Sequence, residues 1–367
     1  MKELDYLKEL ISIKSFDLFE NKEVIDYLYS KFVNEVEDII MIKNDDNEKV
    51  NLLIGLNTKL KDVNDAVILS GHIDTVEAKE DEYSTDPYKA VIKHGKLYGL
   101  GSIDMKSFFA CILANLTSLK TYGVPIVIAI SSDEETDLCG VKKITQTMKE
   151  LNIVPRLTIV GEPSNMDICI KGKSCLAYKI VVKGKSCHSS VPQNGVNANY
   201  VLARLVLLIE RLSGKFKETT MTCNVISGGN ADNIISDNAK MIFDLRTFNV
   251  RYVEKILSRI YREIYKLTRK YKGVEIKLEN KLDILPFDNN AKKFIKLCKE
   301  LEVKKKVFVG GCEAGYFQAL GGSAIVCGVG ELSLAHKPNE YVEIDELKLY
   351  FSKLCKIISF AENNNLS

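Results

Sequence analysis

Histidine and acidic side chains follow apolar runs in this sequence, in positions from which they could bind metal ions. The segment VILSGHID places His72 and Asp74 just after the apolar residues 67–69, and Asp104 follows the glycine-rich turn GLGSID. Residues two apart in a strand point to the same face of a sheet. We therefore expect the imidazole of His72 to bind a metal ion while the Asp74 carboxylate holds the other ring nitrogen.

Three further motifs supply the same kinds of side chain. They are SSDEET after an apolar run, VGEPS after another, and AHKPNEY near the C-terminus. The candidate ligands from all of these motifs are His72, Asp104, Glu135, Glu162 and His336. Imidazole and carboxylate without thiolate form the ligand set of a hydrolytic site for zinc or a similar divalent ion. One bridging aspartate with two terminal ligands per ion would suit two metals about 3.5 to 4 Å apart, which would acidify a bound water molecule.

The adjacent acids Glu134 and Glu135 are expected to have different roles. Neighbouring side chains at the end of a strand diverge, so one carboxylate can bind metal while the other faces the water and transfers its proton. We assign Glu135 to the metal and Glu134 to the role of general base and then general acid. The residues themselves leave open the reverse assignment and a site in which both acids bind metal.

The segments that carry these motifs have the pattern of an α/β domain. Helical periodicity extends over 5–36, a core helix is predicted over 106–122, and apolar strands are predicted over 66–70, 124–130 and 157–160. The motifs follow the C-terminal ends of apolar strands, with helices between the strands. Open α/β sheets bind ligands at this edge, so we expect the site there.

A different pattern begins near Lys171. Elements predicted in this region are strands over 176–183, 241–246 and 274–278 and helices over 197–212 and 252–271. They indicate a small α+β domain inserted into the first one. From about residue 285 the first pattern returns and ends in a helix over 344–360. We predict a catalytic domain made of residues 1–172 and 282–367, with residues 173–281 as the inserted domain.

The composition restricts the expected partners and compartment. The 367 residues include 51 Lys and Arg against 49 Asp and Glu, without a polybasic block, so nucleic acid is not expected as a partner. The N-terminal segment lacks the apolar core of a signal peptide, and no run approaches the roughly 18 apolar residues of a membrane span. Ten scattered cysteines without CxxC spacing indicate reduced thiols. We expect a cytoplasmic protein that does not bind membranes.

Five motifs in one order resemble a known family. SGHIDTVEA, GLGSIDMK, SSDEETDLCG, IVGEPSN and AHKPNEYVEIDEL are similar to motifs of the dinuclear zinc metallopeptidase and deacylase family, which contains acetylornithine deacetylase, succinyl-diaminopimelate desuccinylase, aminoacylase and carboxypeptidase G. The resemblance covers nearly the whole chain. It implies a zinc-exopeptidase-like α/β catalytic domain with an inserted α+β domain that serves as a lid and forms a homodimer.

The resemblance also implies roles for individual residues. Two divalent ions are implied, zinc with cobalt as the alternative, and their ligands would be His72, Asp104, Glu135, Glu162 and His336. Asp104 would bridge the ions, Glu134 would be the acid and base, and Asp74 would support His72. This pattern orders Glu134 and Glu135, which the residues alone did not.

Three residues of the inserted domain are implied in catalysis or substrate binding. His188, in KSCHSSVPQNG, would stabilise the oxyanion of the tetrahedral intermediate, and Arg246 and Asn233 would hold the substrate carboxylate. The alternatives are structural: His188 could cap a helix, Arg246 could pair with Asp244, and Asn233 could belong to a turn. Cys187 stands where glycine is frequent in the family and could change how His188 is presented.

The resemblance implies hydrolysis of an amide bond between a small acyl group and the α-nitrogen of an amino acid. DEET, EAGYFQALG and CGVGELSLAHKPNEYV look most like the acetylornithine deacetylase branch, so N-acetyl-ornithine is the expected substrate, in arginine biosynthesis. A succinyl-diaminopimelate desuccinylase or a dipeptidase of the same family remains an alternative. A catalytically silent relative with a binding or regulatory role is an alternative of a different class.

Overall fold

The chain divides into two compact units. A computed structural model describes residues 2–16, 21–45, 49–289, 291–364 and 366. The first unit comprises Met1–Gly172 and Asn289–Ser367, and the second comprises Lys173–Asp288. Each unit has its own hydrophobic core.

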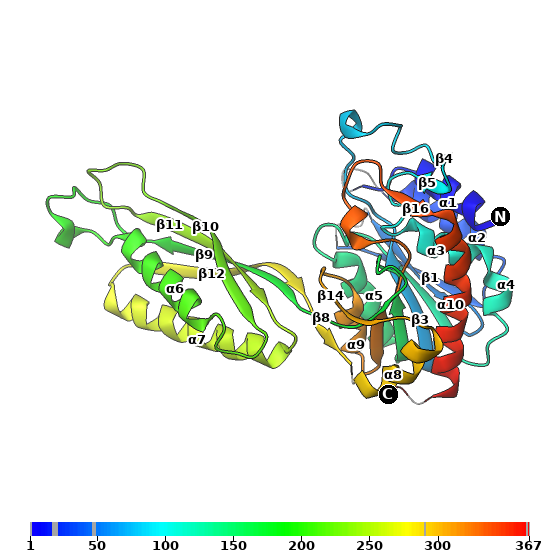
Figure 1. Ribbon diagram of the computed structural model, residues 1–367. Coiled ribbons are helices and arrows are strands. Elements are labelled where there is room, and N and C mark those ends of the chain that lie inside the picture. The colour runs from blue at the N-terminus through cyan, green and yellow to red at the C-terminus, as the bar shows by residue number, and fades with distance from the viewer. Residues whose placement is uncertain (1, 17–20, 46–48, 290, 365, 367) are drawn as a thin grey trace. The chain divides into compact units, whose positions relative to one another are not determined.

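The first unit alternates strands and helices along most of its length (Figure 1). Its strands are β1 (Asp38–Lys43), β2 (Val50–Gly55), β3 (Asn64–His72), β4 (Val91–Lys93), β5 (Lys96–Tyr98), β6 (Ile126–Ser131), β7 (Val154–Val160), β8 (Ile168–Gly172), β14 (Lys305–Phe308), β15 (Ser323–Val326) and β16 (Tyr341–Glu343). Its α-helices are α1 (Lys2–Ser12), α2 (Lys22–Phe32), α3 (Lys106–Ala114), α4 (Leu116–Leu119), α5 (Cys139–Glu150), α8 (Ala291–Glu300), α9 (Ala314–Gln318) and α10 (Ile344–Asn363). The short 3₁₀ helices are η1 (Glu80–Glu82) and η3 (Leu332–Leu334).

The main sheet of the first unit is mixed. Its strands follow the order β1-β2-β6-β3-β7-β15-β8, and β14 also pairs with β8. The central strands β6, β3, β7 and β15 are parallel to their neighbours in that group, whereas β1 is antiparallel to β2, β2 to β6, and β8 to β15. β14 is parallel to β8. β6 is buried along its whole length, as expected for a central strand covered by helices on both faces. A smaller sheet has the order β16-β5-β4.

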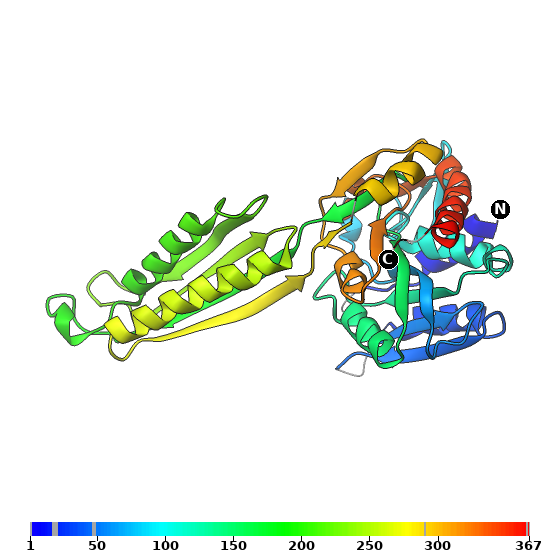
Figure 2. The same ribbon diagram turned by 90° about the horizontal axis from the view of Figure 1, so that it is seen from below.

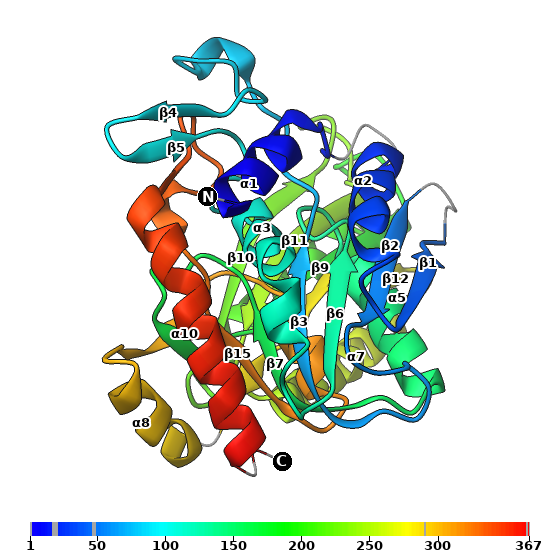
Figure 3. The same cartoon turned by 90° about the vertical axis from the view of Figure 1, so that its right-hand side faces the viewer.

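Helices cover both faces of the main sheet. In Figure 3, α1, α3 and α10 lie in front of the central strands, and these three helices contact one another. α5 and α9 contact each other and pack on strands β6 and β7, respectively. These layers confirm the mixed α/β fold class predicted from the sequence.

Two predicted helices are shorter than the sequence indicated. The helical periodicity over 5–36 corresponds to α1 and α2, which are separate because the chain runs beside the end of β3 after Ser12: Ser15 Oγ donates to Ile73 O, and Phe16 forms a bridge with Thr75. Residues 17–20 lie outside the described part. The predicted helix over 106–122 is likewise divided into α3 and α4 at Asn115.

The second unit is a four-stranded sheet covered by two helices. Its strands have the order β10-β11-β9-β12, and all neighbours are antiparallel. Its elements are β9 (Cys175–Lys183), η2 (Pro192–Asn194), α6 (Ala198–Leu212), β10 (Thr220–Gly228), β11 (Asn238–Arg246), α7 (Val250–Lys270), β12 (Glu275–Ile284) and β13 (Phe287–Asp288). Asn197 and Asn249 cap α6 and α7 by accepting from Asn199 N and Arg251 N. Both helices lie on the same face of the sheet (Figure 2).

No helix in the described part of the chain is both long and apolar enough to cross a membrane.

The burial of β6 gives a stability prediction. Replacing Ile128, which is 0% exposed, with alanine should lower the free energy of unfolding by about 2 to 5 kcal/mol, because a cavity remains between the sheet and its helices. Met41→Ala on the edge strand β1, where the side chain is 48% exposed, should change it by less than about 0.5 kcal/mol. Urea unfolding followed by circular dichroism measures both. Equal effects of the two substitutions would contradict the central position of β6.

Candidate metal centre

Parallel pairing places the candidate ligands at one edge of the sheet. His72, the last residue of β3, pairs with Ser131, the last residue of β6, and Ser70 pairs with Val160, the last residue of β7. The chain segments that follow β6 and β7 therefore start at the level of His72. Glu162 comes two residues after Val160, so it lies beside the imidazole.

The His72 ring is oriented by the backbone of Asp74. Nδ1 of His72 lies 2.9 Å from the carbonyl oxygen of Asp74, and the nearer contact with the Asp74 carboxylate is 3.7 Å, longer than a hydrogen bond. The sequence-based expectation that the carboxylate holds the ring is therefore corrected. β3 ends at His72, so the two-residue period of a strand no longer applies at position 74. A carbonyl acceptor fixes the proton on Nδ1 and leaves Nε2 free to bind a metal.

Two groups of possible metal ligands share Asp104. The first consists of His72, Asp104 and Glu162, and the second consists of Asp104, Glu135 and His336. Nε2 of His72 lies 3.0 Å from Oδ1 of Asp104, and Nε2 of His336 lies 3.2 Å from Oδ2 of the same carboxylate. Each oxygen of Asp104 therefore faces a different histidine. This is the arrangement that a carboxylate bridging two ions requires.

The two adjacent glutamates lie in different surroundings. Oε1 of Glu135 is 2.9 Å from Nε2 of His336, and its backbone N–H donates to Oδ2 of Asp74. Glu134 belongs to a third possible ligand group with His72 and Glu135. Glu135, rather than Glu134, thus accompanies Asp104 and His336, and the roles of the two acids stay a prediction.

The donor set fits divalent metal ions. Burial, together with the negative charge of neighbouring acids, raises the pKa of Glu134 and of Glu162 well above the usual range for carboxyl groups. Burial opposes ionisation of Asp104 as well, but hydrogen bonds from His336 and His72 outweigh it and lower its pKa. Oε1 of Glu162 is buried without a hydrogen-bond partner among the described residues. Crowded acids with an unpaired oxygen need a cation to compensate their charge.

Glycines allow a helix to approach the ligands closely. A Cβ atom on Gly71 would lie 2.0 Å from Cε of Met105, and one on Gly161 would lie 2.2 Å from Cγ of Phe108. These glycines precede His72 and Glu162 directly. Their lack of a side chain lets the N-terminal end of α3, which follows Asp104, pack against both strand ends.

The sequence analysis missed a buried acid behind the centre. Glu313 is 0% exposed, and its two carboxylate oxygens accept from the hydroxyl groups of Ser70 and Ser131. These serines lie on β3 and β6, shortly before His72 and Glu134, so Glu313 links the strands that carry them. The sequence signal that could have indicated a buried polar partner was the presence of a serine in each of two largely apolar strands.

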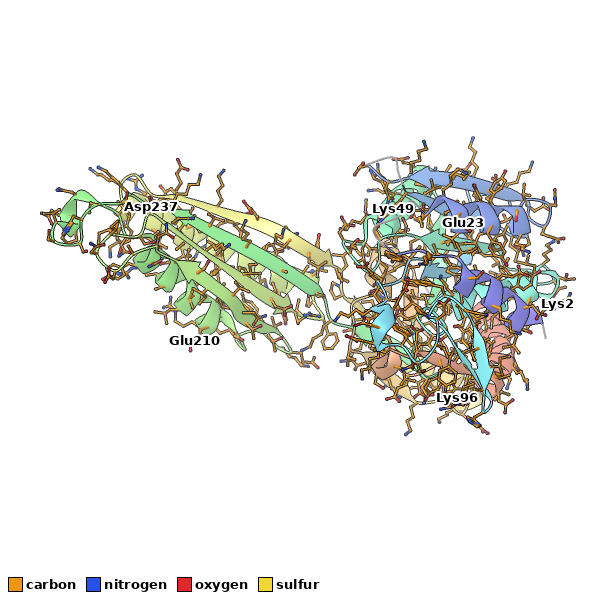
Figure 4. The ribbon with its side chains drawn as sticks, turned by 90° about the horizontal axis from the view of Figure 1, so that it is seen from above. Lys2, Glu23, Lys49, Lys96, Glu210 and Asp237 are labelled. Atoms are coloured by element: carbon orange, nitrogen blue, oxygen red, sulfur yellow. The ribbon has the colours of Figure 1, made fainter. Side chains whose placement is uncertain are left out.

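Asp133 and its partners support the turn that carries Glu134 and Glu135. Asp133 pairs with Lys49, which is labelled in Figure 4, and also accepts from Nδ2 of Asn44. Asp133 has a φ of 62°, in the left-handed region that residues other than glycine rarely adopt. These contacts hold the turn that presents Glu134 and Glu135.

Three predicted site residues lie in the second unit. His188 is exposed, its Nδ1 is 2.8 Å from Oγ of Ser190, and its backbone forms a bridge with Ile234, next to Asn233. Nε of Arg246 donates to both carboxylate oxygens of Asp244, at 3.0 and 2.9 Å. The structure therefore places His188 next to Asn233, although the two loops that carry them are far apart in the sequence. It pairs Arg246 with Asp244. Their roles with substrate stay predictions.

Comparisons with known proteins find similar sequences and a similar fold. The family model described as Peptidase family M20/M25/M40 matches residues 68–359. A relative from Buchnera aphidicola subsp. Schizaphis graminum, named acetylornithine deacetylase, is 31% identical over 89% of this chain and 88% of the relative. One of the same name from Aliivibrio fischeri is 27% identical over 96% of this chain and 97% of its own length. The solved structure of aminopeptidase PepT from Bacillus cereus is similar in fold, with a TM-score of 0.76 and 20% identity over 98% of each chain.

The protonation of the centre gives a prediction for metal binding. In the metal-free protein the pKa values of Glu134 and Glu162 are raised, and hydrogen bonds with Asp104 and Glu135 raise the pKa of His336 to about 10. The folded state therefore holds protons that the unfolded state releases. Metal-free protein should therefore lose stability as the pH rises, from about 4.5 upward for the two glutamates and between about 6.5 and 10 for His336. Metal ions replace these protons, so zinc should raise the Tm more at pH 8 than at pH 6.

Thermal unfolding of chelator-treated protein, with and without zinc or cobalt, measures this difference. Asp104→Asn, which removes the shared carboxylate, should lose most of the increase at both pH values. An equal increase in the variant would show that the metal binds elsewhere.

Proposed function

Because this chain belongs to the peptidase family M20/M25/M40 and is therefore a hydrolase of that family, we propose that it removes a small acyl group from the α-nitrogen of an amino acid. The proposed substrate is N-acetyl-ornithine, which would give acetate and ornithine, a step of arginine biosynthesis. Relatives named acetylornithine deacetylase, 27 to 31% identical to this chain over most of its length, support this choice of substrate.

One observation carries the proposal of a two-metal amidohydrolase. The two oxygens of Asp104 face two histidines in two ligand groups, and the further acid Glu134 lies against both His72 and Glu135. The ligands of the first ion would be His72, Asp104 and Glu162, and those of the second Asp104, Glu135 and His336. Zinc is the proposed metal, with cobalt as an alternative. Bound there, the ions would polarise the amide carbonyl and make a water molecule more acidic.

Glu134 is the proposed proton carrier. Its raised pKa suits a group that accepts a proton from the attacking water and later donates it to the departing amine. Asp74 and the backbone around it fix His72, so the imidazole keeps one orientation through the reaction.

Residues of the second unit are proposed to recognise the substrate. His188 would support the developing oxyanion, and Asn233 would assist in holding the substrate carboxylate. Arg246 would bind that carboxylate through two parallel N–H groups of its guanidinium. In the structure a single N–H, that of Nε, is shared between the two carboxylate oxygens of Asp244. The unit is also the proposed surface of a homodimer. The partners are thus a small N-acyl amino acid and a second copy of the chain, without nucleic acid or membrane.

A cytoplasmic location is part of the proposal. All ten cysteines are free thiols, and burial raises the pKa of Cys111 and Cys327, which keeps them unreactive. Such thiols are typical of proteins kept in a reducing compartment.

Hydrolysis of a substrate panel tests the proposed reaction. Metal-free protein titrated with zinc or cobalt should recover activity near two equivalents per chain, with N-acetyl-ornithine preferred over N-succinyl-diaminopimelate, N-acetyl-methionine and a dipeptide. Preference for another member of the panel would replace the proposed substrate. No hydrolysis of any member by metal-loaded protein would contradict the enzymatic proposal and favour a binding role.

Substitution of Glu134 tests the proton carrier. Glu134→Gln should lower kcat by about 10²- to 10⁴-fold, because glutamine keeps the shape of the side chain but cannot accept the proton. Its metal content should remain that of the wild type. The matched control Glu150→Gln, on the exposed end of α5, should leave both quantities unchanged. A Glu134→Gln variant with wild-type kcat would exclude the role.

A further inference from the structure

The carboxylate of Glu340 connects two loops that each carry a proposed metal ligand. Glu340 is 2% exposed, lies four residues after His336 and immediately precedes β16. Its side chain reaches back to the turn that ends in Asp104. It belongs to neither of the ligand groups described above.

Three backbone N–H groups of that turn converge on the Glu340 carboxylate. Oε1 accepts from Ile103 N at 2.7 Å and from Asp104 N at 3.2 Å, and Oε2 accepts from Gly101 N at 3.1 Å. The hydroxyl of Ser102 also donates to Oε1, at 3.4 Å. Hydrogen bonds from backbone N–H groups to a buried carboxylate are among the stronger ones, so the turn is held firmly.

The loop on the other side has a conformation that needs such an anchor. His336 and Asn339 have φ values of 58° and 63°, in the left-handed region, although neither is glycine. Such conformations cost of order 1 kcal/mol or more each and persist only where neighbouring contacts fix them. Asn339 accepts from Ser84, and Glu340 binds the turn, so the C-terminal end of this strained segment is secured.

The position of Glu340 brings its negative charge close to another acid, Asp104. Its carboxylate accepts from the backbone N–H of Asp104 at 3.2 Å, so its negative charge lies near that of the Asp104 side chain. The surrounding N–H groups offset the repulsion between the two charges in part. Cations bound by Asp104 would remove the remaining repulsion, so the Glu340 carboxylate suits a turn that presents a metal ligand.

We infer that Glu340 is a positioning residue of the metal centre: it orients the Asp104 carboxylate toward both ions and fixes its distance from His336. A bridging carboxylate depends strongly on orientation, because each oxygen must face a different ion. Loss of the anchor therefore weakens both metal sites together. This inference rests on the metal centre of the proposed function but not on the proposed substrate.

Glu340→Gln tests this role, with metal affinity as the readout. Glutamine has one acceptor oxygen, so its NH₂ group would face at least one backbone N–H that it cannot bind. The affinity for zinc, measured by competition with a chromophoric chelator, should fall about 10- to 100-fold. The visible absorption of the cobalt-loaded variant should also differ from that of the wild type, because the geometry around Asp104 changes.

Glu343→Gln is the matched control. Glu343 lies three residues further on, has a 42% exposed side chain and pairs with Lys96, which is labelled in Figure 4, so its substitution removes the same charge without touching the turn. The backbone pairing of β16 with β5 is present in both variants, which favours folding of both. Circular dichroism and the Tm of the metal-free proteins monitor this folding.

The outcomes separate positioning from a purely structural role. Weaker zinc binding with an altered cobalt spectrum in Glu340→Gln, at a temperature where the variant is folded, supports the inference. Affinity within twofold of the wild type overturns it, even if the Tm falls, and so does an equal loss in Glu343→Gln. If Glu340→Gln does not fold, Glu340→Asp replaces it: its shorter side chain withdraws the carboxylate from the turn, and unchanged affinity in that variant overturns the inference.

The same measurements distinguish this inference from the proposed reaction. Wild-type protein that binds two metals but hydrolyses no member of the substrate panel contradicts the proposed reaction alone. Wild-type zinc affinity in Glu340→Gln contradicts the positioning role alone.

Discussion

The crowding of buried carboxylates at one edge of the sheet is the constraint on which the rest of the structure depends. Asp104 and Glu162 are at most 5% exposed and lie around a single buried imidazole, that of His72. Acids so placed repel one another and lose the solvation that water gave them, which costs several kcal/mol for each ion without a partner. A pair of divalent cations relieves both effects. The arrangement is therefore understandable as a metal centre and difficult to explain as a stabilising core.

Buried groups that are not ligands hold these acids in place. Glu313 binds serines of β3 and β6, Lys49 binds Asp133, and Glu340 binds the turn before Asp104. Glu313 and Glu340 connect chain segments that carry different candidate ligands, and Lys49 holds the turn that presents Glu134 and Glu135. The left-handed conformations of Asp133 and His336 occur beside these contacts, which is where strain can be maintained because the surroundings fix the backbone.

The division into two units would separate the metal chemistry that the family shares from the recognition of a particular substrate, which is proposed for the second unit. All candidate metal ligands lie in the first unit, on strands and turns set by one sheet. The residues proposed to recognise substrate lie in the second unit, at the end of strand β11 and on loops, and Arg246 there already binds a carboxylate, that of Asp244. Changes in loops of this kind alter specificity without disturbing the metal ligands.

The sequence by itself determined the types of candidate ligand, their order and the edge of the sheet at which most of them meet. His72 ends an apolar strand and Glu162 comes two residues after another, and parallel pairing of such strands aligns their ends, so local pattern and topology were sufficient. Only the tertiary structure decided which atoms meet. It showed that the carbonyl of Asp74 holds the His72 ring, and that Glu340 binds Asp104 from 236 positions away. Such contacts depend on the direction of the backbone in irregular turns. Hydrophobic periodicity carries no information about that direction, because it reports only which residues face the core.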